Sequence, residues 1–384
     1  MPTPPDFARP GHLGNLTPEQ ALKLQQTWIH LLRLCNLPSS VPHRTPNLTP
    51  SLQPQLADPS PASVWRLLWN LFLHDHPDVT LLRFLRARKW DVPSALSTLL
   101  SVLNWRRALR LDDVLIRQGD SLPSSDQGGF LAQYRSGKAY VRGSDRQARP
   151  VFVIKVALHD PKAQTEEAME MFILHSIETI RTMMRFPEQE TSCLVFDLSG
   201  FGMRNMDFHV VRFLVQVFEA RYPEYLGVLL VHNAPFVFGG IWRMIKPWLD
   251  PVIVSKINFT TGNADLARFI APENLQTCYG GSDAWEYRYI EHVEGENARM
   301  QSEKKDEMHA ERNGLIQQFE LLTVEWASFD PDSVEGRRKA AERDDLAKQL
   351  GDSFWKLDPY VRARTYYHRA GVIDNGVIDF KAAK

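Results

Sequence analysis

Residues 192–231 read SCLVFDLSGFGMRNMDFHVVRFLVQVFEARYPEYLGVLLV, and this stretch decides the fold. Ser192 to Leu198 is a continuous apolar run that is interrupted near its end by Asp197, and Leu226 to Val231 is a second such run. The residues between them, Met206 to Ala220, predict a helix. Buried strands that are joined through a helix are typical of a parallel sheet, so the stretch indicates an α/β fold.

The segments on either side extend this pattern into a mainly parallel sheet with helices packed on it. A helical block at Val64–Arg117 precedes the sheet, and the charged region Asn297–Lys384 follows it with helical patterns at 315–326 and 340–355. The other expected elements are helices at 17–34, 163–185 and 264–270, strands at 139–142, 151–158 and 252–259, and an amphipathic aromatic segment at 236–248.

These elements predict four regions. Residues 1–62 are expected to hold a tail, one short helix and a linker rich in proline and serine. Residues 63–125 form a helical lobe, and residues 126–285 form the α/β lobe with its sheet. Residues 286–384 are a charged, helical C-terminal extension.

Composition excludes several classes of protein. The 384 residues include 45 basic and 46 acidic side chains, so bulk charge does not recruit nucleic acid or another polyanion. The cysteines Cys35, Cys193 and Cys278 are too few and too far apart for a disulfide framework or a zinc site, and we expect the last two to be buried thiols. No apolar run is long enough to span a membrane. We therefore expect a soluble cytoplasmic protein that contacts membranes reversibly.

Signatures of catalysis are absent where we would expect them. The chain has no nucleophile elbow G-x-S-x-G, no phosphate-binding G-x-x-x-x-G-K-[ST] loop, no G-x-G-x-x-G and no metal-binding H-E-x-x-H. His175 lies on an apolar helix and His232 ends a strand, so both are expected to be hydrogen-bonded core residues rather than ligands. This pattern argues against an enzyme, a metal site or a cofactor.

Several short segments occur in a fixed order: LLRFLRARKW at 81–90, YPEYLG at 222–227, HNAPF at 232–236, KPWLDPVIVSK at 246–256 and YGG at 279–281. Together they resemble the CRAL-TRIO lipid-transfer family, and above all its fungal phosphatidylinositol-transfer proteins. The resemblance covers Val64 to Ser282. It implies a helical N-terminal lobe packed on an α/β lobe, whose sheet floors an apolar lipid pocket.

The resemblance also implies roles for individual residues. In phosphatidylinositol-binding relatives, the matching positions place Arg88, Glu224 and Lys256 on the inositol phosphate, with Lys89 as an accessory. A guanidinium and an ammonium suit a phosphate, and a carboxylate suits the hydroxyls of the inositol ring. A mobile segment would close the pocket as a gate, and its Gly239-Gly240 pair favours movement. The gate residues would be Phe236, Phe238, Ile241, Trp242, Ile245 and Trp248, with Met244 between them.

Pocket positions depart from relatives that also bind phosphatidylcholine. Ser192 keeps one hydroxyl, but Leu194, Phe152 and Ile177 stand where those relatives carry hydroxyl or tyrosine side chains. A choline phosphate would lose donors in an apolar cavity, so phosphatidylcholine binding is in doubt. The second ligand is then another apolar molecule, such as a sterol or an isoprenoid hydrocarbon. Relatives that bind haem use histidine and tyrosine, and Ser192 and Leu194 offer neither.

The sequence therefore predicts a protein without chemical turnover that binds phosphatidylinositol in an internal pocket. It would transfer this lipid between membranes or present it to phosphoinositide metabolism. One alternative is a carrier of a sterol, an isoprenoid hydrocarbon or haem. The other is a regulatory scaffold, filled with lipid, that binds a protein partner through its C-terminal helices.

Overall fold

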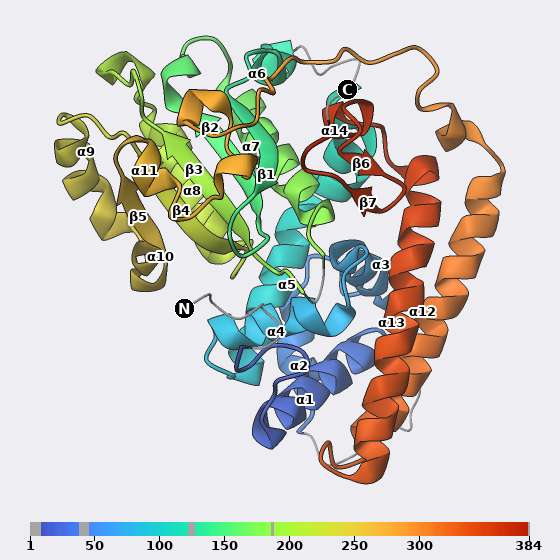
Figure 1. Ribbon diagram of the computed structural model, residues 1–384. Helices are drawn as coiled ribbons and strands as arrows, with labels where there is room; N and C mark the ends of the chain where they lie inside the picture. The colour runs from blue at the N-terminus through green and yellow to red at the C-terminus, as the bar shows by residue number, and fades with distance from the viewer. Residues whose placement is uncertain (1–8, 38–45, 122–126, 186–187, 383–384) are drawn as a thin grey trace.

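The computed structural model describes residues 9–37, 46–121, 127–185 and 188–382. A five-stranded sheet lies at its centre, with strand order β1-β2-β3-β4-β5 (Figure 1). The first pair is antiparallel and every later pair is parallel, which confirms the predicted mainly parallel sheet. The strands are β1 (Ala139–Ser144), β2 (Pro150–Lys155), β3 (Ser192–Asp197), β4 (Leu226–His232) and β5 (Ile257–Thr260).

Alternate residues of each strand face opposite sides of the sheet, as a strand requires. On one face, Phe152 and Leu194 point toward α7 (Glu166–Thr182) and α8 (Phe208–Ala220). On the other face, residues such as Val153 and Cys193 pack with the segment that contains α11 (Gly262–Leu266). The short α6 (Phe130–Arg135) packs against α7.

One predicted strand is partly a helix. Residues 252–259 were expected to be extended because they are rich in β-branched side chains, but α10 (Pro251–Ser255) occupies the first half and β5 the second. Asp250 caps α10 by accepting from the Val252 amide, and Pro251 fits the first turn of a helix. Before α10 lie α9 (Phe238–Ile245) and a 3₁₀ turn, Lys246–Trp248.

The N-terminal lobe is helical, as predicted. It contains α1 (Pro18–Leu34), α2 (Thr49–Leu52), α3 (Pro61–Phe72), α4 (Pro77–Ala87) and α5 (Val92–Ala108). Parts of the expected linker and tail pack against this lobe. Leu52 and Leu56 of the expected linker are buried in the core of this lobe. In the expected tail, the Gly11 carbonyl accepts from Arg86 at 3.0 Å, while residues 1–8 and 38–45 lie outside the described part.

Two long helices of the C-terminal extension run beside the N-terminal lobe (Figure 1). They are α12 (Lys304–Ser328) and α13 (Val334–Val361), each longer than predicted. Phe319 and Trp326 of α12 belong to the same apolar core as Trp28 of α1. Arg343 of α13 makes a buried, two-pronged ion pair with Asp78 of α4, with both N–O distances at 2.7 Å. The extension therefore completes the core of the N-terminal lobe.

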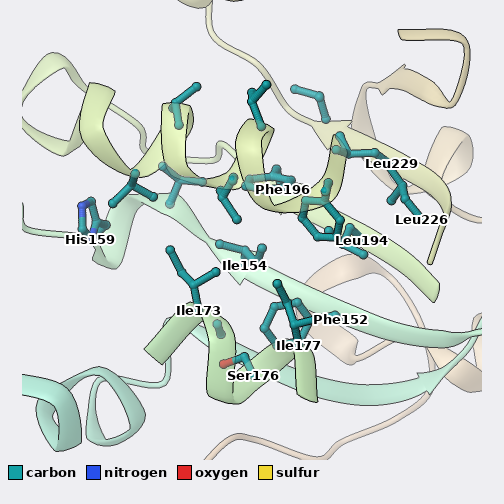
Figure 2. Close-up of a pocket in the computed structure, with 18 of the residues that line it drawn as sticks. Phe152, Ile154, His159, Ile173, Ser176, Ile177, Leu194, Phe196, Leu226 and Leu229 are labelled. Atoms are coloured by element: carbon teal, nitrogen blue, oxygen red, sulfur yellow. The ribbon is translucent and has the colours of Figure 1, made fainter. Parts of the chain in front are cut away.

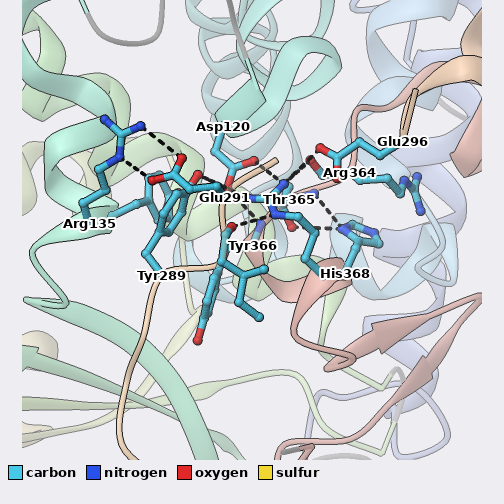
Figure 3. A network of polar contacts seen from close by, with 12 residues as sticks. Asp120, Arg135, Tyr289, Glu291, Glu296, Arg364, Thr365, Tyr366 and His368 are labelled. Carbon is cyan, nitrogen blue, oxygen red and sulfur yellow. Dashed lines mark hydrogen bonds and ion pairs between the residues drawn. The ribbon is translucent and has the colours of Figure 1, made fainter. Parts of the chain in front are cut away.

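After α13 the chain returns to the sheet through α14 (Tyr366–Arg369), β6 (Ile373–Asp374) and β7 (Val377–Ile378). Figure 3 shows the polar network at this junction, which gathers around Asp120. Arg369 lies 2.7 Å from Asp120, and the Tyr366 amide donates to the same carboxylate at 2.9 Å. The Gly143 amide also donates to the Phe380 carbonyl at 3.0 Å. The boundaries between the four predicted regions remain predictions, although one continuous set of contacts joins the regions.

The cysteines show one correction. Cys35 and Cys193 are buried, but Cys278 is exposed, because it sits in a 3₁₀ turn outside the sheet. Among the described residues, no helix is long and apolar enough to cross a membrane. The same part of the chain holds no cluster of His, Cys, Asp and Glu that fits a metal ion.

Candidate functional site

A cavity lies between the sheet and the helices α7 and α8 (Figure 2). Its volume is about 260 Å³. An apolar cavity of roughly 150 Å³ already takes up benzene, so this one has room for a larger apolar group. The four pocket positions predicted from sequence all line it: Phe152, Ile177, Ser192 and Leu194.

The wall of the cavity is almost entirely aliphatic and aromatic. α8 contributes Val210, Leu214 and Phe218, which are only half-buried because one side of each faces the cavity. α7 contributes Phe172 and Ile173 from the opposite side. Such a wall offers an apolar ligand contact on every side and offers few hydrogen bonds.

Polar and charged side chains border the cavity at the end where the strands begin. The Ser192 hydroxyl donates to the Tyr225 carbonyl at 3.2 Å. The Arg83 guanidinium lies over the Tyr225 ring, 3.9 Å from the ring centroid. The Arg181 guanidinium lies 5.2 Å from the same centroid. This end of the cavity therefore borders a charged layer, by which we mean Arg83, Arg86, Glu224 and Lys256.

Two of the predicted headgroup residues lie in that charged layer, just outside the cavity wall. The Lys256 ammonium donates to the Leu226 carbonyl at 2.7 Å, and Leu226 itself lines the cavity. Burial lowers the pKa of Lys256, and Glu224 nearby opposes this shift. Glu224 has a φ of 61°, a left-handed conformation that is strained for glutamate. Arg83 holds this turn by donating to the Glu224 carbonyl at 2.9 Å.

The other two predicted headgroup residues lie elsewhere. Arg88 donates to the Thr98 hydroxyl at 2.9 Å, on the side of α5, and Lys89 is exposed. The guanidinium that reaches the Glu224 carboxylate is that of Arg86, at 2.5 Å. Because α4 ends at Ala87, Arg88 caps the helix and points away from the face that carries Arg83 and Arg86. The i, i+3 spacing of Arg83 and Arg86 was the sequence signal that could have indicated that these two arginines share one face of α4.

Arg86 also connects the layer to a buried carboxylate that the sequence did not single out. Its guanidinium lies 3.0 Å from Glu190, which is fully buried. Glu190 and Glu224 thus hold Arg86 from two sides, and Arg83 donates to the Glu190 carbonyl at 2.5 Å. The layer therefore presents guanidinium, ammonium and carboxylate groups within a few residues of the cavity.

Four buried charged residues lie near this layer: Asp75, Arg106, Glu178 and Arg181. Burial opposes ionisation of Glu178, but Arg106 and Arg181 outweigh it and lower the pKa of Glu178 to about 2. Burial raises the pKa of Asp75 to about 7, despite Arg181 at 3.8 Å. Asp75 is thus the one member of this group whose charge changes near neutral pH.

Three of the residues predicted to form a gate face the cavity. Phe238, Trp242 and Ile245 line it, and Ile241 is buried in the cluster that contains Phe201. The outer side of the segment exposes apolar side chains, since Phe236 is fully exposed and Met244 is 46% exposed, together with the charged side chains of Arg243 and Lys246. Trp248 lies beside Phe208, with ring centroids 6.5 Å apart. A Cβ atom added at Gly239 or Gly240 would meet nothing within 4 Å, so no close contact explains these glycines.

The far end of the cavity, where the strands finish, holds a polar triad that sequence reasoning missed. The Lys138 ammonium lies 3.0 Å from His159 Nδ1, and His159 Nε2 lies 3.1 Å from Asp207 Oδ2. All three residues line the cavity, and Figure 2 shows His159 at the end opposite Leu226. They come from three separate elements, so no short motif joins them.

The two histidines expected in the core are there. His175 is buried and hydrogen-bonded to the Tyr134 hydroxyl. His232 is buried, with Nδ1 3.0 Å from the Thr260 hydroxyl. Burial lowers the pKa of both, so each stays neutral at pH 7.

An α/β lobe with an apolar cavity, a charged layer beside the cavity and an apolar segment along the cavity wall can enclose an apolar ligand. Comparison with known proteins agrees. The family described as CRAL/TRIO domain matches residues 134–281, and its N-terminal domain matches residues 51–101.

Two relatives match most of the chain. A CRAL-TRIO domain-containing protein of Schizosaccharomyces pombe is 38% identical over 307 residues, which cover 79% of this chain and 68% of the relative. The phosphatidylinositol transfer protein CSR1 of Eremothecium gossypii is 37% identical over 315 residues, with 81% and 72% covered. Among solved structures, the crystal structure of Sfh5 has a TM-score of 0.45 at 18% identity, covering 55% of this chain and 73% of its own.

This chain belongs to the CRAL-TRIO family. The family consists of lipid-binding and lipid-transfer proteins, which typically perform no chemical turnover.

Proposed function

We propose that this protein binds phosphatidylinositol, with its acyl chains in the cavity and its headgroup at the charged layer, and transfers it between membranes or presents it to phosphoinositide metabolism. The observation that carries this proposal is the position of Lys256. Its ammonium is bound to the carbonyl of a residue that lines the cavity, Glu224 lies near it, and Arg86 pairs with Glu224. A relative named as a phosphatidylinositol transfer protein supports the same ligand.

The chemistry of the layer suits this headgroup. Ammonium and guanidinium groups bind the phosphate, and a carboxylate accepts hydrogen bonds from the inositol hydroxyls. Glu224 is one-third exposed on its side chain, whereas Glu190 is buried, so Glu224 is the carboxylate that a ligand reaches. We propose Lys256, Glu224 and Arg86 as the headgroup contacts, and Arg88 and Lys89 as more distant contributors through their positive charge.

The apolar cavity explains why a carrier is needed at all. Burying an acyl chain of about 16 carbons is worth roughly 13 kcal/mol at about 0.8 kcal/mol per methylene, so escape of the lipid into water is negligible. Exchange requires the protein to dock on a membrane and open. We assign the opening to the segment 236–248, whose inner side lines the cavity and whose outer side exposes Phe236.

Mass spectrometry of the lipids that purify with the full chain tests the ligand, and vesicle assays with labelled lipids test the transfer. We expect phosphatidylinositol as the main bound phospholipid, and its transfer to exceed that of phosphatidylcholine. Recovery of a sterol, an isoprenoid hydrocarbon or haem without phosphatidylinositol would overturn the proposal and favour a different carrier.

A further inference from the structure

The triad of Lys138, His159 and Asp207 lies at the end of the cavity opposite the proposed phospholipid headgroup, and the proposed function gives these polar residues no role. The headgroup layer borders the start of β3 and β4, and the triad borders the end of β2. The strand β3 has six residues, which corresponds to roughly 16 Å between its ends. A phospholipid with its headgroup at Lys256 would bring only the methyl ends of its chains to the triad, and methyl groups need no buried charge.

The hydrogen bonds within the triad fix its protonation pattern. His159 is neutral, because burial and Lys138 lower its pKa. Its Nδ1 accepts from the Lys138 ammonium, so its Nε2 carries the proton and donates to Asp207. Asp207 also accepts from the Val210 amide at 3.1 Å, as the cap of α8. One ammonium and one carboxylate thus give the triad no net charge.

The Lys138 ammonium is short of acceptors. It is 4% exposed and has three N–H donors. In the part of the chain that the structure describes, its contacts are His159, the Met169 sulfur at 3.6 Å and the face of Phe172 at 5.8 Å. Only the first of these is a strong acceptor. Burial accordingly lowers the pKa of Lys138 to about 8, although Asp207 lies nearby.

We propose that this triad binds the hydroxyl group of a neutral lipid alcohol, whose apolar body occupies the cavity. A hydroxyl oxygen accepts from the free N–H of Lys138, and its proton is donated to Asp207, whose oxygens retain lone pairs. A neutral group keeps the triad uncharged, whereas a carboxylate or a phosphate would bury an unmatched negative charge. A carbonyl group would accept a hydrogen bond from Lys138, but it has no proton to donate to Asp207. The assignment is independent of the headgroup that binds at the other end.

A retention assay tests the assignment on the full-length protein. The protein is incubated with phosphatidylcholine vesicles that carry octadecan-1-ol, octadecane and methyl stearate. It is then recovered, and the bound probes are quantified by mass spectrometry relative to their content in the vesicles. We expect the wild type to retain the alcohol at least tenfold over the alkane, and above the ester, because it gains a hydrogen bond to a charged group.

Three variants locate the preference. Lys138→Met should reduce the ratio of alcohol to alkane at least fivefold. The double variant Lys138→Met with Asp207→Asn should do the same while keeping the triad neutral and the α8 cap in place, since asparagine also caps helices. Lys155→Met is the matched control, because Lys155 also borders the cavity but its ammonium lies over the Tyr140 ring, 5.6 Å from its centroid. It should keep the wild-type ratio.

Equal retention of alcohol and alkane by the wild type would overturn the assignment, whatever the variants do. So would an unchanged ratio in folded Lys138→Met, or retention of methyl stearate as high as that of the alcohol. If Lys138→Met does not fold, the charge-neutral double variant decides in its place. Phosphatidylinositol transfer, measured on the same proteins, reports separately on the function proposed above.

Discussion

Replacing Lys256 with methionine tests the headgroup layer directly. Methionine keeps most of the aliphatic stem and removes the ammonium, which is held 2.7 Å from the Leu226 carbonyl. Loss of one charge-assisted contact to a buried anion costs about 2–3 kcal/mol, so the affinity for phosphatidylinositol should fall about 30- to 150-fold. Because burial already lowers the pKa of Lys256, its charge is not a strong source of folding stability, and the variant should fold.

The assay measures transfer of labelled phosphatidylinositol between vesicles together with equilibrium binding of the same lipid. The matched control is Lys246→Met, which removes an exposed ammonium from the segment 236–248, outside the charged layer. The control should bind like the wild type. If Lys256→Met transfers and binds phosphatidylinositol like the wild type while remaining folded, the headgroup does not lie at this layer.

Three further predictions concern the pocket, the gate and stability. Transfer of phosphatidylcholine should be at least tenfold slower than that of phosphatidylinositol in parallel vesicle assays, because Leu194 offers no donor, and similar rates would contradict this. Phe236→Asp should slow lipid exchange severalfold without changing thermal stability. The control Val334→Asp, at another exposed apolar position, should leave the exchange rate unchanged. Equal exchange rates for both variants would place the membrane contact elsewhere. Asp75 has a folded pKa of about 7 and an unfolded pKa near 4, so between these values the folded state holds a proton that the unfolded state lacks, and stability falls as pH rises. Asp75→Asn should therefore raise the free energy of unfolding, relative to the wild type, more at pH 8 than at pH 5, by on the order of a few kcal/mol. Urea unfolding at both pH values measures this difference, and parallel pH profiles would refute it.

The fold was largely predictable because its signals are local. The apolar runs at 192–198 and 226–231 are buried strands in any plausible arrangement, and Thr17 and Asp91, both good N-cap residue types, cap α1 and α5. The error at Val252 has a local cause. Its β-branched neighbours favour a strand, but the preceding Asp250 and Pro251 form a helix start, and this start prevails.

The candidate site was less predictable because it depends on contacts between distant segments. The resemblance implied that Glu224 and Lys256 share one site, and in the structure they come together because β4 and β5 are adjacent. Arg86 reaches Glu224 across 138 residues, and the end of α4 turns Arg88 away from it. The triad around His159 joins a residue before β1, a turn and a helix cap. Nothing in the sequence near any of the three indicates the other two.

The pairing of Asp78 with Arg343 has a consequence for how this protein is made. The two residues are 265 positions apart, and the core around Trp28 needs Phe319 and Trp326 of α12 to be complete. At a synthesis rate of 5–20 residues per second, the ribosome needs roughly 13 to 53 seconds to make the chain between these partners.

During that interval the aromatic side chains of α1 and α3 are not yet covered by α12, and the Asp78 carboxylate lacks the arginine with which it pairs. The N-terminal lobe is therefore finished last although it is made first. Nascent chains of this protein should depend on chaperones that shield apolar surface until α13 has left the ribosome.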